Sequence, residues 1–435
     1  MSAARPASLP ARIKDRPAAR PGGRRGKQRH PHIQHTAPPR PVTLLPAPDM
    51  SLKSTILGFP RMGSDRQLKK LVEAFWAGKA TAQELADGSK ALRAEHWALQ
   101  VKHGLSEVPV GDFSYYDHVL DAAFAAGIIP ARYQQLDTAG TQAYFAMARG
   151  LQDKAIGVDV PSLEMKKWFD TNYHYMVPEI ADGQVFALGT TKVVDEFNEA
   201  KALGYAARPV VLGPVSLLAL SKAAKGASSK PLDHLSALLP VYVELLGQLA
   251  AAGAEWVQVD EPVLALDLDA AVYQPLFEQA FGALAGVAGL KLLLTSYFDR
   301  LGDNLAWAAA LPVHGIHLDL VRGAADLDAA IAGIPSDKVI SAGLINGRNI
   351  WKADLGKQLE VLRQLVDARK AAGAAPVWVN SSCSLLHSPH SLAPEAGHLD
   401  EETLGWLSFA EEKIEEVAVL AAAVATPDAV RAQLD

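Results

Sequence analysis

Short runs of apolar residues, rich in Val, Ile and Leu, recur from Thr55 onward and alternate with longer stretches of helical periodicity. Because the runs are nearly continuous rather than alternating with polar residues, they predict strands that are buried on both faces. An eighth and weaker strand is predicted near Tyr173–Val177, where a His interrupts the run and a Pro follows it. The seven clearer runs are Thr55–Phe59, Arg208–Gly213, Trp256–Asp260, Lys291–Tyr297, Gly315–Leu320, Val339–Leu344 and Pro376–Asn380.

Helical patterns fill the intervals between these runs, as in Pro231–Ala252, Ala325–Gly333 and Lys352–Ala372. A strand and a helix repeated this often are typical of parallel βαβ units. Eight strands favour a closed sheet over an open one, so the predicted fold class is α/β, a (βα)8 TIM-like barrel. A last helix is predicted near Glu401–Ala423, after the final strand.

The first and third predicted strands are separated by about 150 residues, which is too many for one crossover connection. Ser64 with Gln67 resembles a capping box and predicts a helix that runs to Ala77. Thr81 with Glu84 predicts a second, longer helix that stops at Gly104. The barrel is therefore expected to carry a helical insertion after its first strand.

The first 49 residues differ from the rest in composition. They hold 8 Arg and 2 Lys against Asp15 and Asp49, a net charge of +8, and 10 of the 27 prolines. Such a segment cannot bury enough apolar surface to offset chain entropy, so a disordered basic tail is predicted. An RNA-binding arm, a targeting peptide, or upstream sequence translated ahead of a true start at Met50 remain alternatives.

The whole chain has a net charge of −6, so residues 50–435 carry −14, and nucleic acid is not an expected partner of this part. Its 49% apolar residues supply ample material for a core, yet no apolar run reaches the roughly 18 residues of a membrane-spanning helix. The single cysteine, Cys383, excludes an internal disulfide and a Cys-rich zinc site, and fits a reducing compartment.

Candidate chemistry is sought where barrel strands end, because functional residues of such barrels lie there. Asp260 and Glu261 end one predicted strand and could act as acid and base, or could instead be tied to neighbouring backbone amides. Cys383, His387 and His390 are possible zinc ligands, although their spacing matches no metal motif and a lone buried Cys is more often a small apolar residue.

Basic residues gather at the start of the first predicted helix. Arg66, Lys69 and Lys70 share one helix face, in the first turn, where the helix dipole disfavours cations. An anion bound by these side chains and by free amides would explain the cluster, whereas the alternative is a solvated face. The segment Ser341–Asn349, with its glycines and an Arg after a strand, also suits contact with an anion.

Seven ordered motifs, spread from residue 55 to about 425, resemble the N-terminal half of cobalamin-independent methionine synthase. The family transfers a methyl group from methyltetrahydropteroyl-polyglutamate to homocysteine, and its members resemble a duplicated pair of barrels. The motifs are Thr55–Lys70, Val110–His118, Trp168–Pro178, Val211–Val215, Trp256–Pro262, Ser341–Asn349 and Ser381–Pro389.

The resemblance implies that zinc and the homocysteine pocket belong to a C-terminal catalytic barrel that this sequence does not include. In the present half, the family's four zinc-ligand positions correspond approximately to Leu294, Ser296, Asp319 and Cys383, and the proton-donating His falls near Arg348. Leu and Ser are poor zinc ligands, so no catalytic and no metal-ligating residue is expected here. A separately encoded catalytic half is a possible partner.

The resemblance assigns part of the folate-tail site to this half. The family's binding motif corresponds to Arg66, Gln67, Leu68 and Lys69, with Gln in place of the usual Glu, and a further tail-binding Lys corresponds to Lys167. Arg and Lys are suitable partners for the carboxylates of a polyglutamate. The implied ligand is 5-methyltetrahydropteroyltri-L-glutamate.

These observations give one expected organisation and two candidate functions. Residues 1–49 form the tail, 50–426 the N-terminal barrel, and 427–435 the start of an inter-barrel linker. The first candidate is the polyglutamate-binding half of a cytoplasmic methyltransferase of methionine biosynthesis, inactive by itself. The second is a stand-alone, non-catalytic protein that binds folate polyglutamates or regulates through them.

Overall fold

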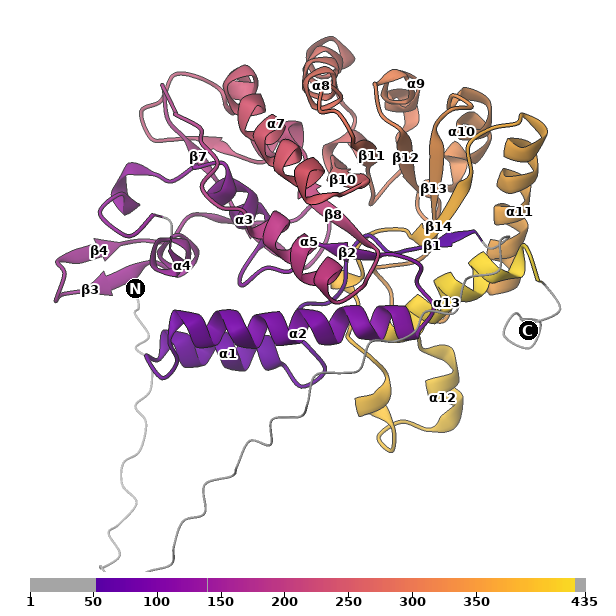
Figure 1. Ribbon diagram of the computed structural model, residues 1–435, viewed down its shortest axis with the longest axis horizontal. Helices are drawn as coiled ribbons and strands as arrows, with labels where there is room; N and C mark the ends of the chain where they lie inside the picture. The colour runs from indigo at the N-terminus through magenta and orange to yellow at the C-terminus, as the bar shows by residue number, and fades with distance from the viewer. Residues whose placement is uncertain (1–51, 139, 427–435) are drawn as a thin grey trace, which may run out of the picture. The chain divides into compact units, whose positions relative to one another are not determined.

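The computed structural model describes residues 52–138 and 140–426, so the predicted tail 1–49 and linker 427–435 lie outside the described residues. Eight parallel strands form one curled sheet in the order β1-β14-β13-β12-β11-β10-β8-β2 (Figure 1). This arrangement confirms the predicted TIM-like α/β fold. The strands are β1 Lys53–Ser54, β2 Val108–Val110, β8 Ala207–Leu212, β10 Trp256–Asp260, β11 Lys291–Thr295, β12 Gly315–Asp319, β13 Val339–Ile345 and β14 Val377–Ser381.

The seam between β1 and β2 is joined by individual hydrogen bonds, since these two strands form no ladder with each other in the described part of the chain. The backbone amide of Ser106 donates to the carbonyl of Ser54 (3.1 Å), and the amide of Ser54 donates to Ser106 Oγ (2.9 Å). Thr55 Oγ1 donates to the carbonyl of Glu107 (3.2 Å). Side-chain hydroxyls thus replace part of a strand ladder where the sheet meets itself.

The prediction of a barrel strand near Tyr173–Val177 is wrong. This segment contains β6 (His174–Met176), which pairs antiparallel with β5 (Met165–Lys167) in a separate hairpin. The missing barrel strand is β2, whose three residues pair in parallel with β8. A run of three residues is too short to give a recognisable pattern, and only its parallel neighbour identifies it as part of the barrel.

Helices follow the strands around the outer side of the sheet (Figure 1). The helices predicted between the later strands are confirmed, with starts displaced by two to four residues. The predicted helix at Glu401–Ala423 is broken into two, because residues 406–408 instead bond to the loop 350–352. The helices outside the insertions are α6 Pro214–Ala219, α7 Leu235–Ala252, α8 Ala270–Leu284, α9 Leu305–Ala310, α10 Leu327–Gly333, α11 Leu355–Ala371, α12 Glu401–Trp406 and α13 Ala410–Ala423.

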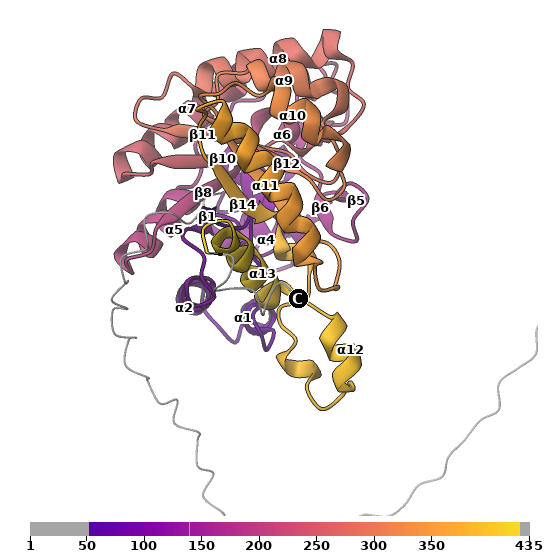
Figure 2. The same cartoon turned by 90° about the vertical axis from the view of Figure 1, so that its right-hand side faces the viewer.

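The predicted insertion after the first strand consists of α1 (Gln67–Trp76) and α2 (Ala82–Lys102). The capping box of Thr81 and Glu84 at the start of α2 is confirmed. The box of Ser64 and Gln67 is not formed, because α1 begins only at Gln67 and Arg66 occupies the cap position without a side-chain bond to the helix. Helix α2 lies beside α13 (Figure 2), where His103 bonds to two glutamates of α13.

A second and larger insertion separates β2 from β8. Its described residues contain three α-helices and short strands that lie outside the eight-stranded sheet. One apolar cluster fills the barrel and its helical layer, and a second lies among α1, α2, α3 and α4. The elements of this insertion are α3 His118–Ala125, α4 Thr141–Arg149, α5 Lys192–Ala202, β3 Leu151–Asp153, β4 Val158–Val160, β5, β6 and β7 Glu179–Ile180, which pairs with β9 Lys222–Ala223.

The segment Pro231–Ala252, which includes α7, is long and apolar enough to cross a membrane by length and composition alone. Its apolar side chains have another explanation, because Leu238, Leu246 and Leu249 are fully buried in the protein core. Core helices of this kind satisfy the same criterion, so α7 is weak evidence for a membrane span.

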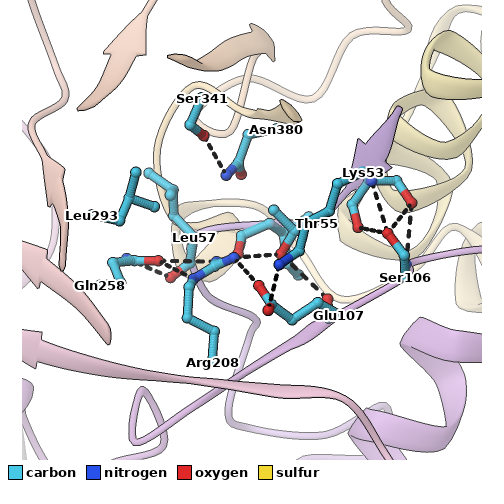
Figure 3. Close-up of polar contacts among 12 residues, drawn as sticks. Lys53, Thr55, Leu57, Ser106, Glu107, Arg208, Gln258, Leu293, Ser341 and Asn380 are labelled. Carbon is cyan, nitrogen blue, oxygen red and sulfur yellow. Dashed lines mark hydrogen bonds and ion pairs between the residues drawn. The ribbon is translucent and has the colours of Figure 1, made fainter. Parts of the chain in front are cut away.

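The barrel interior is polar at its centre (Figure 3). Arg208 of β8 is fully buried and pairs with Glu107 (Nη1–Oε2, 2.5 Å). Its other donors bond to Gln258 Oε1, Thr55 Oγ1 and the carbonyl of Ile56. A buried guanidinium needs such partners because an unpaired charge inside a protein is costly. Its multiple contacts connect the segment after β1, the segment before β2, β8 and β10 at the seam.

Candidate functional site

The two acids that end β10 have different roles. Glu261 is fully buried and accepts hydrogen bonds from the backbone amides of Val215 (3.1 Å) and Ser216 (2.7 Å) at the start of α6. Burial raises its pKa to about 7. Any side chain at Gly213 would meet the Glu261 carboxyl at 2.2 Å, so only glycine fits there. For Glu261, therefore, the structural alternative holds: the carboxyl group is tied to backbone amides.

Asp260 instead borders a cavity at the carboxyl ends of the strands. Its carboxylate accepts hydrogen bonds from Gln258 Nε2 (2.7 Å) and from the Tyr297 hydroxyl (3.2 Å). Burial and, to a smaller extent, the nearby Asp112 carboxyl raise its pKa to about 7, although the hydrogen bonds and the Arg208 charge oppose the shift. This acid is therefore available to a ligand in a way that Glu261 is not.

As the pH rises, the stability of Asp260→Asn is expected to increase relative to that of the parent protein. The raised pKa means that the folded state holds a proton that the unfolded chain releases near pH 4, so stability falls between about pH 4 and pH 7. Asn never ionises and avoids this loss. We expect the difference between variant and parent to shift by about 1–3 kcal/mol in favour of Asn between pH 5 and pH 8. Urea unfolding at both pH values measures it.

The exposed carboxylate of Asp267 supplies the control for this titration. Asp267→Asn should change the unfolding free energy equally at pH 5 and pH 8. A shift of the same size in both variants would attribute the effect to overall charge and not to the buried position of Asp260.

The residues at the four positions corresponding to the family's zinc ligands do not fit zinc. Leu294 has no donor atom, and Ser296 offers only a hydroxyl, which is buried without a hydrogen-bond partner. Asp319 already accepts from the amides of Phe298, Val321 and Arg322 at 2.9–3.1 Å. Burial raises the pKa of the Cys383 thiol, which disfavours the thiolate that zinc requires.

The candidate set Cys383, His387 and His390 is divided among different contacts. His387 lies against Tyr173 and Phe298, whereas His390 lies against Phe59 and His96. Across residues 52–138 and 140–426, no group of three His, Cys, Asp or Glu side chains is arranged to hold a metal ion.

The start of α1 is an uncapped helix end with exposed cations. Arg66 adopts a left-handed conformation (φ 53°), which is costly for a residue with a side chain. The amides of Gln67 and Lys69 have no hydrogen-bond acceptor within the described residues. Arg66 and Lys69 are exposed, and Lys69 pairs only loosely with Glu73 (3.7 Å). Free amides beside exposed cations are suited to an anion.

The other predicted residues of this site have different environments. Leu68 is fully buried, so its side chain holds α1 in place and cannot contact a ligand. Gln67 accepts from the amide of Asp65 (2.9 Å). Lys167 lies exposed on β5, and no ion pair involves it in the described part of the chain. The hairpin β5–β6 and helix α1 lie apart in Figure 2.

The segment Ser341–Asn349 supplies an arginine that is already paired. Arg348 bonds to Asp170 (Nη1–Oδ1, 2.7 Å), and Arg322 bonds to the other oxygen of the same carboxylate (2.7 Å). Burial opposes ionisation of Asp170, yet the two guanidinium groups hold its pKa below the usual value. No local sequence pattern marks Asp170, because its partners are more than 150 residues away in the chain.

Comparison with known proteins identifies relatives over most of the chain. A family model described as the N-terminal domain of cobalamin-independent synthase matches residues 53–370. A 5-methyltetrahydropteroyltriglutamate–homocysteine methyltransferase of Xylella fastidiosa (strain 9a5c) is 52% identical over 371 residues, which are 85% of this chain and 48% of the relative. A probable one of Schizosaccharomyces pombe is 45% identical and covers 88% of this chain and 50% of the relative.

Solved structures share the fold at low sequence identity. A B12-independent methionine synthase from Shewanella sp. W3-18-1 has a TM-score of 0.56 at 12% identity and covers 87% of this chain and 99% of that one. A putative vitamin-B12-independent methionine synthase from Listeria monocytogenes has a TM-score of 0.54 at 13% identity, with coverage of 85% and 96%. The chain spans about half the length of the curated relatives it matches. This chain belongs to the cobalamin-independent methionine synthase family, and its barrel is that family's N-terminal domain.

Proposed function

We propose that this barrel binds the polyglutamate tail of 5-methyltetrahydropteroyltri-L-glutamate for a methyltransferase that makes methionine from homocysteine. The observation that carries the proposal is the uncapped start of α1, where Arg66 and Lys69 stand beside the free amides of residues 67 and 69. The relatives named above are, by name, methyltransferases that act on the triglutamate form of the folate. A polyanionic tail is the ligand that these cations and amides suit best.

In this proposal each residue has a distinct part. Arg66 and Lys69 offer charge, and the amides of the first helical turn offer directed donors to a carboxylate. Leu68 anchors the turn in the second apolar cluster, and so fixes where the cations stand. Lys167, on the separate hairpin, would hold a more distant carboxylate of an extended tail. Gln67, in place of a glutamate, keeps negative charge away from the polyanion.

Triglutamate folate is expected to bind more tightly than monoglutamate folate at low ionic strength. Exposed ion pairs contribute roughly 0.2–1 kcal/mol each, so several on one tail could reach about 2 kcal/mol, or about thirtyfold in affinity. The difference should shrink at high salt because exposed charges are screened. It should disappear in Arg66→Ala/Lys69→Ala/Lys167→Ala. Calorimetric titration of both folates against both proteins measures these affinities.

A charge-matched control removes three exposed cations elsewhere. Lys225, Lys357 and Arg363 are exposed and form no ion pair within the described residues. The triple alanine variant of these residues should retain the preference for triglutamate. Equal affinities for the two folates in the unmutated chain would show that the start of α1 is only a solvated basic face.

The methyl transfer itself is assigned to a catalytic barrel outside this sequence, which would carry zinc and homocysteine. In such a reaction zinc lowers the pKa of the bound thiol, so that the thiolate forms. The four corresponding positions of this barrel do not fit zinc. The purified chain is therefore expected to make no methionine from homocysteine and triglutamate folate with added zinc. Turnover above a protein-free blank would contradict this assignment.

The second candidate function is that of a stand-alone protein that binds folate polyglutamates. Such a protein would also prefer triglutamate folate, but it would not stimulate the activity of a catalytic half. Supplying a catalytic barrel from a relative in trans separates the two, since only the first function predicts restored turnover. The net charge of −14 on residues 50–435 supports a small-molecule ligand over nucleic acid, and a cytoplasmic location accords with the single cysteine.

A further inference from the structure

A cavity of about 110 Å³ lies at the carboxyl ends of β8 and β10, away from the start of α1. Its walls are mostly aliphatic and come from β8 and from helices α3, α5 and α7, with Ala122, Val211, Leu212 and Leu245 among them. The lining also contains polar side chains; those of Asp112, Asp260, Ser384 and His387, from the segment after β2, from β10 and from the segment after β14, are called its polar end. The cavity is thus amphipathic, with mostly aliphatic walls and a polar end.

Two carboxylates at the polar end have no cationic partner. Asp112 accepts a hydrogen bond from the amide of Phe59 (2.8 Å), and Asp260 accepts from a neutral amide and a phenol. Neither forms an ion pair with any residue of 52–138 or 140–426. The lysine of the cavity wall, Lys192, is already engaged by Asp121 (3.3 Å) and Glu196 (3.4 Å). The polar end therefore carries more negative than positive groups.

Two imidazoles border the same cavity, and both are neutral at pH 7. Burial lowers the pKa of His118 to about 3 and that of His387 to about 4. His387 is partly exposed, and its ring nitrogens have no hydrogen-bond partner among the described residues. A neutral imidazole always presents one acceptor nitrogen, so His387 can offer this acceptor to the cavity. The acceptor is independent of the two carboxylates and is available to a ligand that carries N–H donors.

We propose that this cavity binds a small primary aliphatic amine as its ammonium ion. An ammonium group has three N–H donors, and Asp112, Asp260 and His387 are acceptors among the residues that line the cavity. The alkyl chain lies along the aliphatic wall. Since an apolar cavity of about 150 Å³ can hold benzene, this cavity has room for an alkylamine of about five heavy atoms. A divalent metal is disfavoured, because the described residues contain no set of three ligands arranged for one.

The proposal is tested with n-butylamine at pH 8, where the amine is charged and both carboxylates are ionised. Calorimetric titration at constant ionic strength should give saturable binding with a dissociation constant on the order of 1 mM, as suits so few atoms. n-Butanol, which keeps the chain without the charge, and butyrate, which reverses the charge, should bind at least tenfold more weakly. Equal binding of butanol would overturn the ammonium assignment, and no saturable binding of butylamine would overturn the site.

Three variants separate this site from surface charge and from misfolding. Asp260→Asn keeps the shape of the side chain and should weaken butylamine binding at least tenfold, and Asp112→Asn should do the same. Ala122→Phe fills the apolar part of the cavity with all charges retained, and should also abolish binding. Asp267→Asn, on the exposed surface, should change nothing. Circular dichroism and thermal melting check that each variant is folded before its titration is interpreted.

The site is independent of the proposed folate function, and the experiment keeps the two apart. Arg66→Ala/Lys69→Ala/Lys167→Ala should lose the triglutamate preference and retain butylamine binding. Asp260→Asn should show the reverse pattern. If Asp112→Asn and Asp260→Asn both fold and both bind butylamine as tightly as the parent, the carboxylates have only a structural role.

Discussion

Arg208→Met is expected to lower the free energy of unfolding by about 3–5 kcal/mol, because removal of one partner of a buried ion pair leaves the other charge inside the protein. Arg208 is fully buried at the barrel seam, and its guanidinium donates to Glu107, Gln258, Thr55 and the carbonyl of Ile56 (Figure 3). Methionine fills a similar volume without a donor. Lys53 still pairs with Glu107 (2.6 Å) in the variant and limits the loss. The shift of the urea midpoint measures it.

Two controls identify the cause of this loss. Adding Glu107→Gln to Arg208→Met removes the carboxylate charge that the first substitution leaves in the interior, and should recover part of the stability. Lys291→Met breaks an ion pair of similar length to Glu255 (2.8 Å) that lies on the surface. Such a pair contributes about 0–1 kcal/mol, so this variant should unfold almost as the parent does. A loss of equal size at Lys291 would contradict the importance of burial.

Asp117→Ala is expected to lower the free energy of unfolding by about 3 kcal/mol, because it removes a helix cap and leaves several buried donors without an acceptor at the same time. The fully buried carboxylate accepts from the amides of Val119 (3.0 Å) and Leu120 (2.9 Å) at the start of α3. It also accepts from the amide of Met176 in β6 (2.9 Å) and from the Tyr173 hydroxyl (3.3 Å). Urea unfolding measures the loss, and amide hydrogen exchange should rise first in α3 and β6.

The matched control for Asp117 is an exposed aspartate with a similar number of hydrogen bonds. Asp182 accepts from the amides and hydroxyls of Ser228 and Ser229, but it lies at the surface. Water can replace these partners, so Asp182→Ala should have a far smaller effect on stability. Comparable losses in the two variants would show that hydrogen-bond number outweighs burial in this protein.

The sequence alone determined the class of the fold because strands buried on both faces must be nearly continuous in apolar residues. The runs ending at Asp260 and beginning at Val339 and Lys291 therefore corresponded closely to β10, β13 and β11. The capping box at Thr81 is equally local, since all its atoms lie within four residues. The family was recognisable for a related reason, as its motifs are contiguous in the chain.

Only the tertiary structure decided which residues meet across the chain. The strand Val108–Val110 is too short to have a pattern, and it exists because β8 supplies its hydrogen bonds. The sequence left Asp260 and Glu261 with two possible roles each, and packing separated them: Glu261 reaches the amides of α6, whereas Asp260 borders the cavity. Local patterns specify elements, but the partners of buried charges come from segments distant in sequence, as Arg208 and Glu107 do. Burial then sets the pKa values and the strength of those contacts, which no local pattern encodes.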